Sequence, residues 1–311
     1  DVPTHRPWAQ PFGVAWVFSS GGPRGFVHVG VIRALDELGL RPDLIVGASA
    51  GALAGVMRAA GHRGEALQAL ALQASPWRVM RLNPWGPPWL AGDALADWVR
   101  EQVGHRALQA LEVPVACVVH RPGPGDLLAF NQGDAGLAVQ ASSAIEGQFA
   151  PVHIGGQDHV DADLHQPLPV RLARALGAQR VLAVDASAHE DKAPPGTEPW
   201  RAGDLRKRAL TEPDARAADL LLHPDTGYYA GLSREYRERI IDIGYRETLA
   251  RLFDEPPTPQ SQAGYIAARY AQDVLQTLEP WATRAQVLQA FQRRSQIDLA
   301  GFRIQFQAQR R

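Results

Sequence analysis

Apolar runs followed by a glycine-containing turn and a helical pattern recur in the first part of the chain. Val14–Phe18 is a near-continuous apolar run, after which Val27, Val31 and Leu35 recur at helical spacing. The segment Asp43–Ala60 repeats this order of strand and helix. Strands that are apolar on both faces are typical of a parallel sheet covered by helices on both sides. The pattern therefore predicts an α/β fold with a mostly parallel central sheet.

The rest of the sequence predicts further strands and helices of this fold, and its composition changes near the C-terminus. Further strands are expected at 113–119, 127–130, 181–185 and, at an edge, 219–223. Helices are expected at 65–73, 94–103, 135–144, 233–253, 262–278 and 283–294. The charged, proline-rich stretch 189–216 reads as an exposed excursion with partial helix. Because the composition shifts at Glu255, we expect a main domain over 13–254 and a helical C-terminal extension over 255–311.

One turn between a predicted strand and a predicted helix carries a candidate nucleophile. Gly47-Ala48-Ser49-Ala50-Gly51 is a Gly-x-Ser-x-Gly sequence in the strand-turn-helix context of a nucleophile elbow. Glycines at both ends allow the sharp turn that exposes a serine hydroxyl. A helix N-terminus beside Ser49 would favour the negative charge that develops in acyl transfer. We therefore expect Ser49 to be the nucleophile and Gly47 and Gly51 to shape its turn.

A second glycine-rich turn, Ser19–Gly25, follows the first predicted strand. It lacks the Gly-Lys-Ser/Thr ending of a P-loop and the Gly-x-Gly-x-x-Gly fingerprint of dinucleotide-binding proteins, so oxyanion stabilisation is favoured over nucleotide binding. Pro23 has no N–H group, so the amide donors must come from Gly21, Gly22, Arg24 or Gly25.

The stretch 75–92 is rich in proline and tryptophan and has neither helical nor strand periodicity. Tryptophan is favoured where a surface is partly apolar and partly wet. Trp77, Trp85 and Trp89 are therefore candidates for a lid or a lipid-contact loop, with packing over the sheet edge as the alternative.

Composition narrows the class of function. Lys plus Arg is 32 and Asp plus Glu is 33, so a general nucleic-acid binder is not expected. The single cysteine, Cys117, lies in an apolar run and indicates a buried thiol rather than a disulfide or a cysteine-rich metal site. No apolar run is long enough to span a bilayer, so a soluble or peripheral protein is expected. Asp1 stands where Met would begin a chain, which indicates signal-peptide removal, and hence export to the periplasm, or trimming.

The ordered blocks resemble the bacterial patatin-like phospholipases from Val14 to about Leu252. Ser20–Gly25 is similar to the oxyanion loop of that family, Val46–Leu53 to its nucleophile elbow, and Val160–Leu164 to its Asp-Gly-Gly/Ala block. Two further matches are Ala141–Ile145 and His223-Pro224-Asp225. The resemblance implies a three-layer α/β/α fold and a bacterial source.

The resemblance also implies a catalytic dyad in which Asp161 is the base for Ser49, with no histidine, metal or cofactor required. Its substrates would be acyl esters, with phospholipid or lysophospholipid as the natural class, and peripheral membrane contact is expected. Two positions depart from the family pattern, since Ser20 replaces a glycine and Ala162-Asp163 stands where two small residues are usual. Asp163 could face Ser49, face solvent, or replace Asp161 as the base.

Two other functions stay open at this point. An α/β-hydrolase would use the same elbow with a downstream histidine, for which His165, His189 and His223 are candidates. The early position of Ser49 argues against it. A non-catalytic lipid-binding or regulatory protein is the second alternative, because a fold does not fix a function.

Overall fold

The computed structural model describes residues 1–74, 81–82, 90–254, 274, 277–278, 282–293, 296–299 and 302–305. Contacts within the chain divide it into two units, Asp1–Arg251 and Leu252–Arg311, and each is described by itself. The domain extents expected from the sequence remain a prediction.

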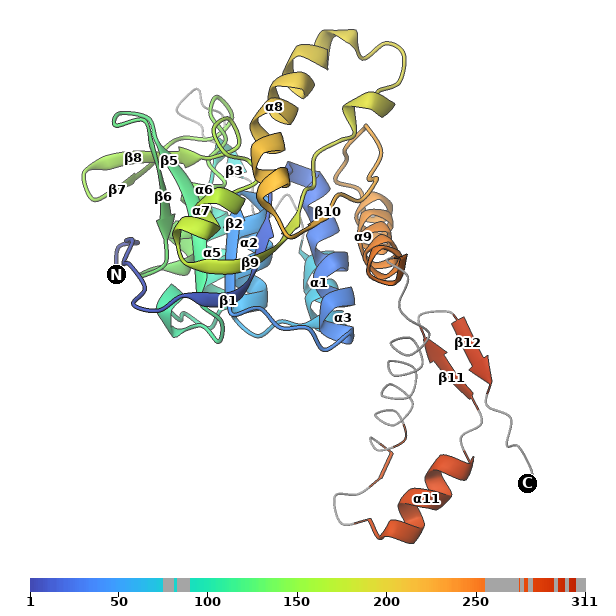
Figure 1. Cartoon of the computed structure of the whole chain (residues 1–311). Coiled ribbons are helices and arrows are strands. Elements are labelled where there is room, and N and C mark those ends of the chain that lie inside the picture. The colour runs from blue at the N-terminus through green and yellow to red at the C-terminus, as the bar shows by residue number, and fades with distance from the viewer. Residues whose placement is uncertain are drawn as a thin grey trace. The chain divides into compact units, whose positions relative to one another are not determined.

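A mixed, mostly parallel sheet forms the centre of the first unit (Figure 1). Its strands are β1 (Phe12–Phe18), β2 (Leu44–Ala48), β5 (Val115–Arg121), β6 (Asp126–Phe130), β7 (Val152–Ile154), β8 (Gln157–Asp161), β9 (Ala178–Val184) and β10 (Leu220–Leu222). The order is β10-β9-β1-β2-β5-β8-β7, and β6 also pairs with β5. The strands from β10 to β5 are parallel, whereas β6 and β8 run antiparallel to β5 and β7 antiparallel to β8.

Helices cover both faces of this sheet. They are α1 (Val27–Glu37), α2 (Ala50–Ala59), α3 (Gly64–Gln73), α5 (Asp93–Gln102), α6 (Ala135–Ser142), α7 (Val170–Ala175), α8 (Arg201–Ala217) and α9 (Arg234–Asp254). Helix α2 lies on the face that carries Ile45, because a Cβ at Gly55 would come within 2.7 Å of that side chain. Helix α7 packs on the opposite face, where Val17 and Val46 share a buried cluster with Val170. The three-layer α/β/α fold expected from the sequence is confirmed.

Helices α1 and α9 lie side by side and meet at glycines (Figure 1). A Cβ at Gly30 would lie 1.9 Å from the Ile241 carbonyl oxygen, and one at Gly244 would lie 2.4 Å from the Val27 carbonyl oxygen. The two backbones are therefore in direct contact, and α9 is fixed against the helix that follows the glycine loop.

Helix α8 is longer than the partial helix expected for 189–216. Only Thr211 and Asp214 are buried along it, so it has no apolar stripe that a sequence pattern could reveal. Asp214 instead accepts hydrogen bonds from Gln166 Nε2 and from the Arg171 backbone amide, both at 2.7 Å. Helix α5 begins at Asp93, and its N-cap residue is Gly92.

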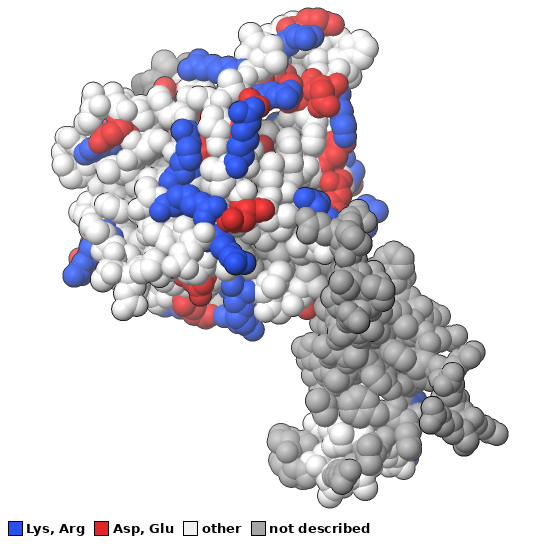
Figure 2. Space-filling view, viewed as in Figure 1, with Lys and Arg blue, Asp and Glu red and all other residues white. Residues whose placement is uncertain are grey.

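The surface of the first unit carries both charges. On the face shown in Figure 2, basic and acidic side chains are interspersed, in line with the balanced composition. Cys117 is fully buried, and its burial raises the pKa of the thiol to about 12, so it is the inert buried thiol that was expected. Among the described residues, no helix combines the length and apolarity needed to cross a membrane.

The second unit contains helix α11 (Arg284–Arg293) and an antiparallel hairpin of β11 (Gln296–Leu299) and β12 (Phe302–Gln305). The hairpin differs from the helical extension expected for this region. Each strand has only four residues, which is too short for a clear two-residue period in the sequence. Strands β3 (Arg81–Leu82) and β4 (Leu90–Ala91) form a separate small pair in the first unit.

Candidate active site

Ser49 occupies the sharp turn between β2 and α2. Its backbone has φ 55° and ψ −122°, one of two positive φ values at non-glycine residues in the described part of the chain. Glycine is required on both sides, because a Cβ at Gly47 would lie 2.3 Å from the Gly51 carbonyl oxygen and one at Gly51 would lie 2.2 Å from the Phe18 carbonyl oxygen. A strained backbone of this kind is commonly found at functional sites.

A buried serine that the sequence analysis did not place in the site holds this turn in position. The Ser49 amide donates to Ser142 Oγ at 2.9 Å, and the Ser142 hydroxyl donates to the Val118 carbonyl oxygen at 2.6 Å. Ser142 is fully buried. The only signal in the sequence was its place in the Ala141–Ile145 block, which suggests no role for its hydroxyl.

The sheet explains why Ser49 and Asp161 meet although they are distant in sequence. Ala48, which precedes Ser49, pairs with Val118 of β5, and Asp161 at the end of β8 pairs with Val119. The two backbones thus flank β5 at nearly the same height, about 10 Å apart by the usual strand spacing. That gap is short enough for the two side chains to approach each other over β5.

Asp161 is almost completely buried, with 2% of its surface exposed. Burial raises its pKa to about 7, and the Asp163 charge adds to the increase, whereas the Ser49 hydroxyl and the Lys207 charge oppose it. Asp161 Oδ1 accepts from the Asp163 amide at 2.8 Å. Oδ2 has no hydrogen-bond partner of full geometry among the described residues, although the Ser49 hydroxyl is near enough to affect the pKa. The two side chains therefore approach each other without a completed hydrogen bond.

Asp163 has two side-chain partners that the sequence analysis did not consider. Its carboxylate accepts a hydrogen bond from Ser20 Oγ and forms an ion pair with Lys207 Nζ at 2.6 Å. Burial opposes ionisation of Asp163, but the Lys207 charge and these hydrogen bonds outweigh it and hold the pKa of that carboxyl below its usual range. The two departures from the family pattern therefore contact each other.

The glycine loop lies directly against the nucleophile turn. A Cβ at Gly25 would lie 2.3 Å from Ala50 Cβ, so this glycine permits the close approach. Gly22 has a φ of 53°. The Arg24 amide donates to the Gly21 carbonyl oxygen at 3.1 Å within a 3-10 helix, which removes it from the expected oxyanion donors. The amides of Gly21 and Gly22 donate to nothing in the described part of the chain and remain candidates.

An apolar cavity of about 380 Å³ opens beside Ser49. Gly22 and Gly25 form its wall on the loop side, and Trp98 of α5 also lines it. Its other apolar side chains come from α1, α2, α3, α5 and the 143–149 loop, and include Phe26, Val29, Leu53, Met57, Leu67, Leu70, Leu95, Ile145 and Phe149. The sequence analysis did not place Trp98 in the site. Trp77, Trp85 and Trp89 lie outside the described residues.

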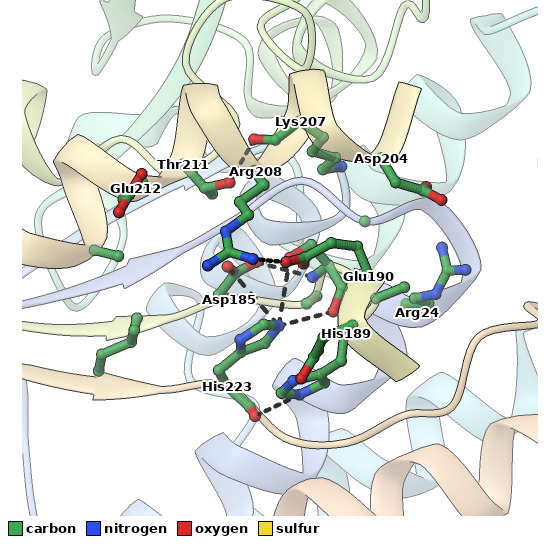
Figure 3. Close-up of a pocket in the computed structure, with 17 residues that line it drawn as sticks. Arg24, Asp185, His189, Glu190, Asp204, Lys207, Arg208, Thr211, Glu212 and His223 are labelled. Carbon is green, nitrogen blue, oxygen red and sulfur yellow. Dashed lines mark hydrogen bonds and ion pairs between the residues drawn. The ribbon is translucent and has the colours of Figure 1, made fainter. Parts of the chain in front are cut away.

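A second, polar cavity of about 450 Å³ is lined by Gly21 and Arg24 of the glycine loop (Figure 3). Within it, Arg208 is paired with Glu190, and Lys207 is paired with Asp163. The glycine loop therefore contributes to two cavities of opposite character, and only the apolar one reaches Ser49.

The histidines nominated for a Ser-His-Asp triad lie elsewhere. His189 and His223 stack on each other at 3.9 Å in the polar cavity (Figure 3), and His165 stacks on His120. His28 is buried, and its Nε2 lies 2.8 Å from the Ser19 carbonyl oxygen. Among the described residues, no histidine lines the cavity at Ser49. The arrangement gives no support to the triad alternative.

Comparisons with known proteins cover the part of the chain that contains this site. The family model for patatin-like phospholipases matches residues 16–174. An NTE family protein of Mycobacterium tuberculosis is 33% identical over 194 residues, which cover 60% of this chain and 54% of that protein. Lysophospholipase NTE1 of Saccharomyces cerevisiae is 25% identical over 187 residues, covering 58% of this chain and 11% of that protein. The chain thus spans about half the length of the mycobacterial relative and a small part of the yeast one.

Two solved structures share parts of the fold at low sequence identity. VipD from Legionella pneumophila has a TM-score of 0.47 at 14% identity, covering 78% of this chain and 67% of that chain. The type III effector protein ExoU has a TM-score of 0.43 at 16% identity, covering 90% of this chain and 68% of that chain.

Proposed function

The chain belongs to the patatin-like phospholipase family, and from this premise we propose that it is a serine esterase that hydrolyses lipid acyl esters through Ser49 and Asp161. The observation that carries the proposal is the arrangement of three features around Ser49. Ser49 lies in a strained turn, Asp161 approaches it from across β5 with a raised pKa, and the unpaired amides of the glycine loop lie beside it.

In the proposed reaction, Asp161 takes the Ser49 proton as the hydroxyl oxygen attacks the ester carbonyl carbon. The amides of Gly21 and Gly22 would stabilise the resulting oxyanion. The C–O bond to the alcohol then breaks, the alcohol leaves with the proton held by Asp161, and an acyl-Ser49 ester remains. Water transfers a proton to Asp161 and attacks this ester, so that the fatty acid is released and Ser49 regains its proton.

A pKa near 7 suits Asp161 to both halves of this cycle. A carboxylate of ordinary pKa is a poor acceptor for a serine proton, and burial makes Asp161 a stronger base. As a consequence, Asp161 is protonated in part of the protein molecules at neutral pH, and those molecules are inactive.

The apolar cavity supports an acyl chain as the group that is bound. Its lining is almost entirely aliphatic and aromatic, and it reaches Ser49 directly. Relatives named lysophospholipases share the matched region with this chain. We therefore propose phospholipids and lysophospholipids as the substrate class, reached by peripheral contact with a lipid surface.

Intact mass after exposure to a fluorophosphonate tests the nucleophile. We expect one adduct on the wild-type chain, none on Ser49→Ala, and labelling slowed by about a hundredfold or more on Asp161→Asn. Ser143→Ala is the matched control, because Ser143 lines the same cavity without occupying the turn, and it should still be labelled. Absence of an adduct on folded wild-type protein would refute the proposal.

Release of fatty acid from lysophosphatidylcholine and phosphatidylcholine then tests the substrate class. We expect release by the wild-type chain and none by Ser49→Ala. Binding to such vesicles without release, together with no fluorophosphonate adduct, would instead support the non-catalytic lipid-binding alternative.

A further inference from the structure

Three potential metal ligands from separate segments converge at the edge of the sheet beyond the candidate active site. They are His120 near the end of β5, Glu146 in the loop after α6, and His165 in the turn after β8. One ligand atom from each lies within 4.8 Å of the other two. Glu146 Oε1 lies 3.9 Å from His120 Nδ1 and 3.8 Å from His165 Nε2. The sequence analysis expects no metal, because the family resemblance requires none.

The His120 side chain supplies a second, independent observation. It is 94% buried, since only 6% of the residue is exposed, and its Nδ1 has no hydrogen-bond partner among the described residues. A buried nitrogen without a partner costs free energy. This nitrogen faces Glu146. The Glu146 side chain is 40% exposed and the His165 side chain is 36% exposed. An ion could therefore enter from solvent and satisfy the buried nitrogen.

The set of donors determines the kind of ion. Two imidazoles and one carboxylate suit Zn²⁺ and related divalent transition metals, not the oxygen ligands that Ca²⁺ and Mg²⁺ prefer. In a tetrahedral site with bonds of about 2.0–2.1 Å, neighbouring donor atoms are about 3.4 Å apart. The two donor separations of 3.8 and 3.9 Å would need to shorten by roughly half an ångström. The rings of His120 and His165 are stacked with centroids 3.4 Å apart, so the His165 ring would also need to rotate to point its nitrogen at the ion. The partly exposed side chains of Glu146 and His165 allow both changes.

We propose that His120 Nδ1, Glu146 and His165 Nε2 bind one divalent transition-metal ion of the Zn²⁺ class, with water as a fourth ligand. The site joins the three segments that surround Asp161. His120 follows Val119, the strand partner of Asp161, and Glu146 lies two residues after Ala144, whose carbonyl accepts from the Asp161 amide at 2.9 Å.

The same ion would also fix one wall of the apolar cavity. Ile145 and Gln148, on either side of Glu146, both line it. The bound ion would therefore hold the carboxylate base and the acyl-chain wall in one arrangement without contacting the reacting atoms. The binding claim itself is independent of the esterase proposal and can be tested without any substrate.

Calorimetric titration of the metal-stripped full chain with ZnCl₂ at neutral pH tests the proposal. We expect one ion per chain, with affinity reduced at least about tenfold in Glu146→Gln and in His165→Ala, both of which alter partly exposed side chains. His153→Ala is the matched control, because His153 also pairs with a carboxylate, Asp158 at 3.0 Å, but on an exposed hairpin. This control should bind Zn²⁺ as the wild-type chain does.

Thermal unfolding gives a second readout that does not depend on heat of binding. Zn²⁺ should raise the Tm of the wild-type chain and of His153→Ala, and should leave the Tm of the two ligand variants nearly unchanged. Failure of the wild-type chain to bind Zn²⁺ would overturn the proposal, and the three side chains would then form ion pairs only. Equal affinity in the wild type and both ligand variants would also overturn it, because binding would then lie at other residues.

Discussion

The Ser20 hydroxyl donates a hydrogen bond to the Asp163 carboxylate, and these are the two positions at which the chain departs from its family pattern. Lys207 of α8 completes the contact by pairing with Asp163. Each departure thus supplies a partner for the other. An unpaired carboxylate so close to Asp161 would be expensive to bury, and here it has a hydroxyl and an ammonium group.

A double-mutant cycle should detect this dependence. Because each single change leaves a polar partner unsatisfied, we expect Ser20→Ala and Asp163→Ala to be coupled by about 0.5–3 kcal/mol in the free energy of unfolding. Urea denaturation measures it. Ser20→Ala combined with Asp158→Ala, on an exposed hairpin, provides the additive control. Additivity of the first pair would show that the contact contributes nothing to stability.

The raised pKa of Asp161 predicts how activity depends on pH. Because Asp161 must be ionised to accept the serine proton, kcat/KM for a neutral ester should rise through about pH 7. The Lys207 charge lowers the pKa of Asp161, so Lys207→Met should move the rise to higher pH. Lys192→Met is the control, since Lys192 pairs with Asp225 on the surface and should leave the profile in place. A profile that moves to lower pH in Lys207→Met would contradict the assignment.

The stability of the folded chain should also depend on the Asp161 carboxyl. Here the protonated form is favourable, whereas activity requires the ionised form. The folded chain holds the Asp161 proton more tightly than the unfolded chain, so this stabilisation is full below about pH 4 and is lost as the pH rises to about 7. A pKa raised from 3.8 to about 7 corresponds to on the order of 4 kcal/mol. Asp161→Asn should therefore raise the Tm relative to wild type more at pH 8 than at pH 4. Asp158→Asn is the exposed control, and an equal difference at both pH values would argue against a raised pKa.

The contact between the glycine loop and the nucleophile turn predicts an effect on catalysis. A methyl group at Gly25 would meet Ala50 Cβ, so Gly25→Ala should push the loop away and reduce kcat by about a hundredfold. Gly203→Ala is a suitable control, because its Cβ would meet nothing within 4 Å. Unchanged kcat in Gly25→Ala would show that the loop does not stabilise the transition state.

Ser142 should matter to both stability and turnover. Ser142→Ala removes the acceptor for the Ser49 amide, which should cost about 1–3 kcal/mol in the free energy of unfolding and reduce kcat by roughly tenfold or more. Ser233→Ala removes a different structural hydroxyl, which accepts from the Tyr236 amide at the start of α9. It should lose comparable stability and keep its kcat. If both variants kept full turnover, Ser142 would have no part in positioning Ser49.

Elements with an apolar run or a glycine turn could be predicted from the sequence, and those held by polar contacts could not. Val14–Phe18 and the turn at Ser49 have local signals, and both were located correctly. Asp161 required the resemblance to a family, since an aspartate in a turn has no distinctive local pattern. Its placement next to Ser49 depends on strand pairing through β5, which a single sequence does not reveal.

Contacts between distant polar residues account for most of what the sequence did not show. The ion pair between Asp163 and Lys207 was not expected. Lys207 lies on α8, in a stretch whose composition indicated an exposed excursion. Ser142 and the cluster around His120 are similar cases. Each depends on side chains brought together by the sheet, and neither has a hydrophobic period that would indicate the contact.

The contact of α1 with α9 has a consequence for how mutations at this protein would be interpreted. Gly30 and Gly244 each lie against the backbone of the other helix, so neither position can accept even a methyl group without separating the helices. In a survey of random substitutions, both glycines would be as intolerant as Gly47 or Gly51 and would be mistaken for residues of the reaction centre. Measuring the amount of folded protein alongside activity would show that changes at Gly30 and Gly244 act through loss of the helix pair.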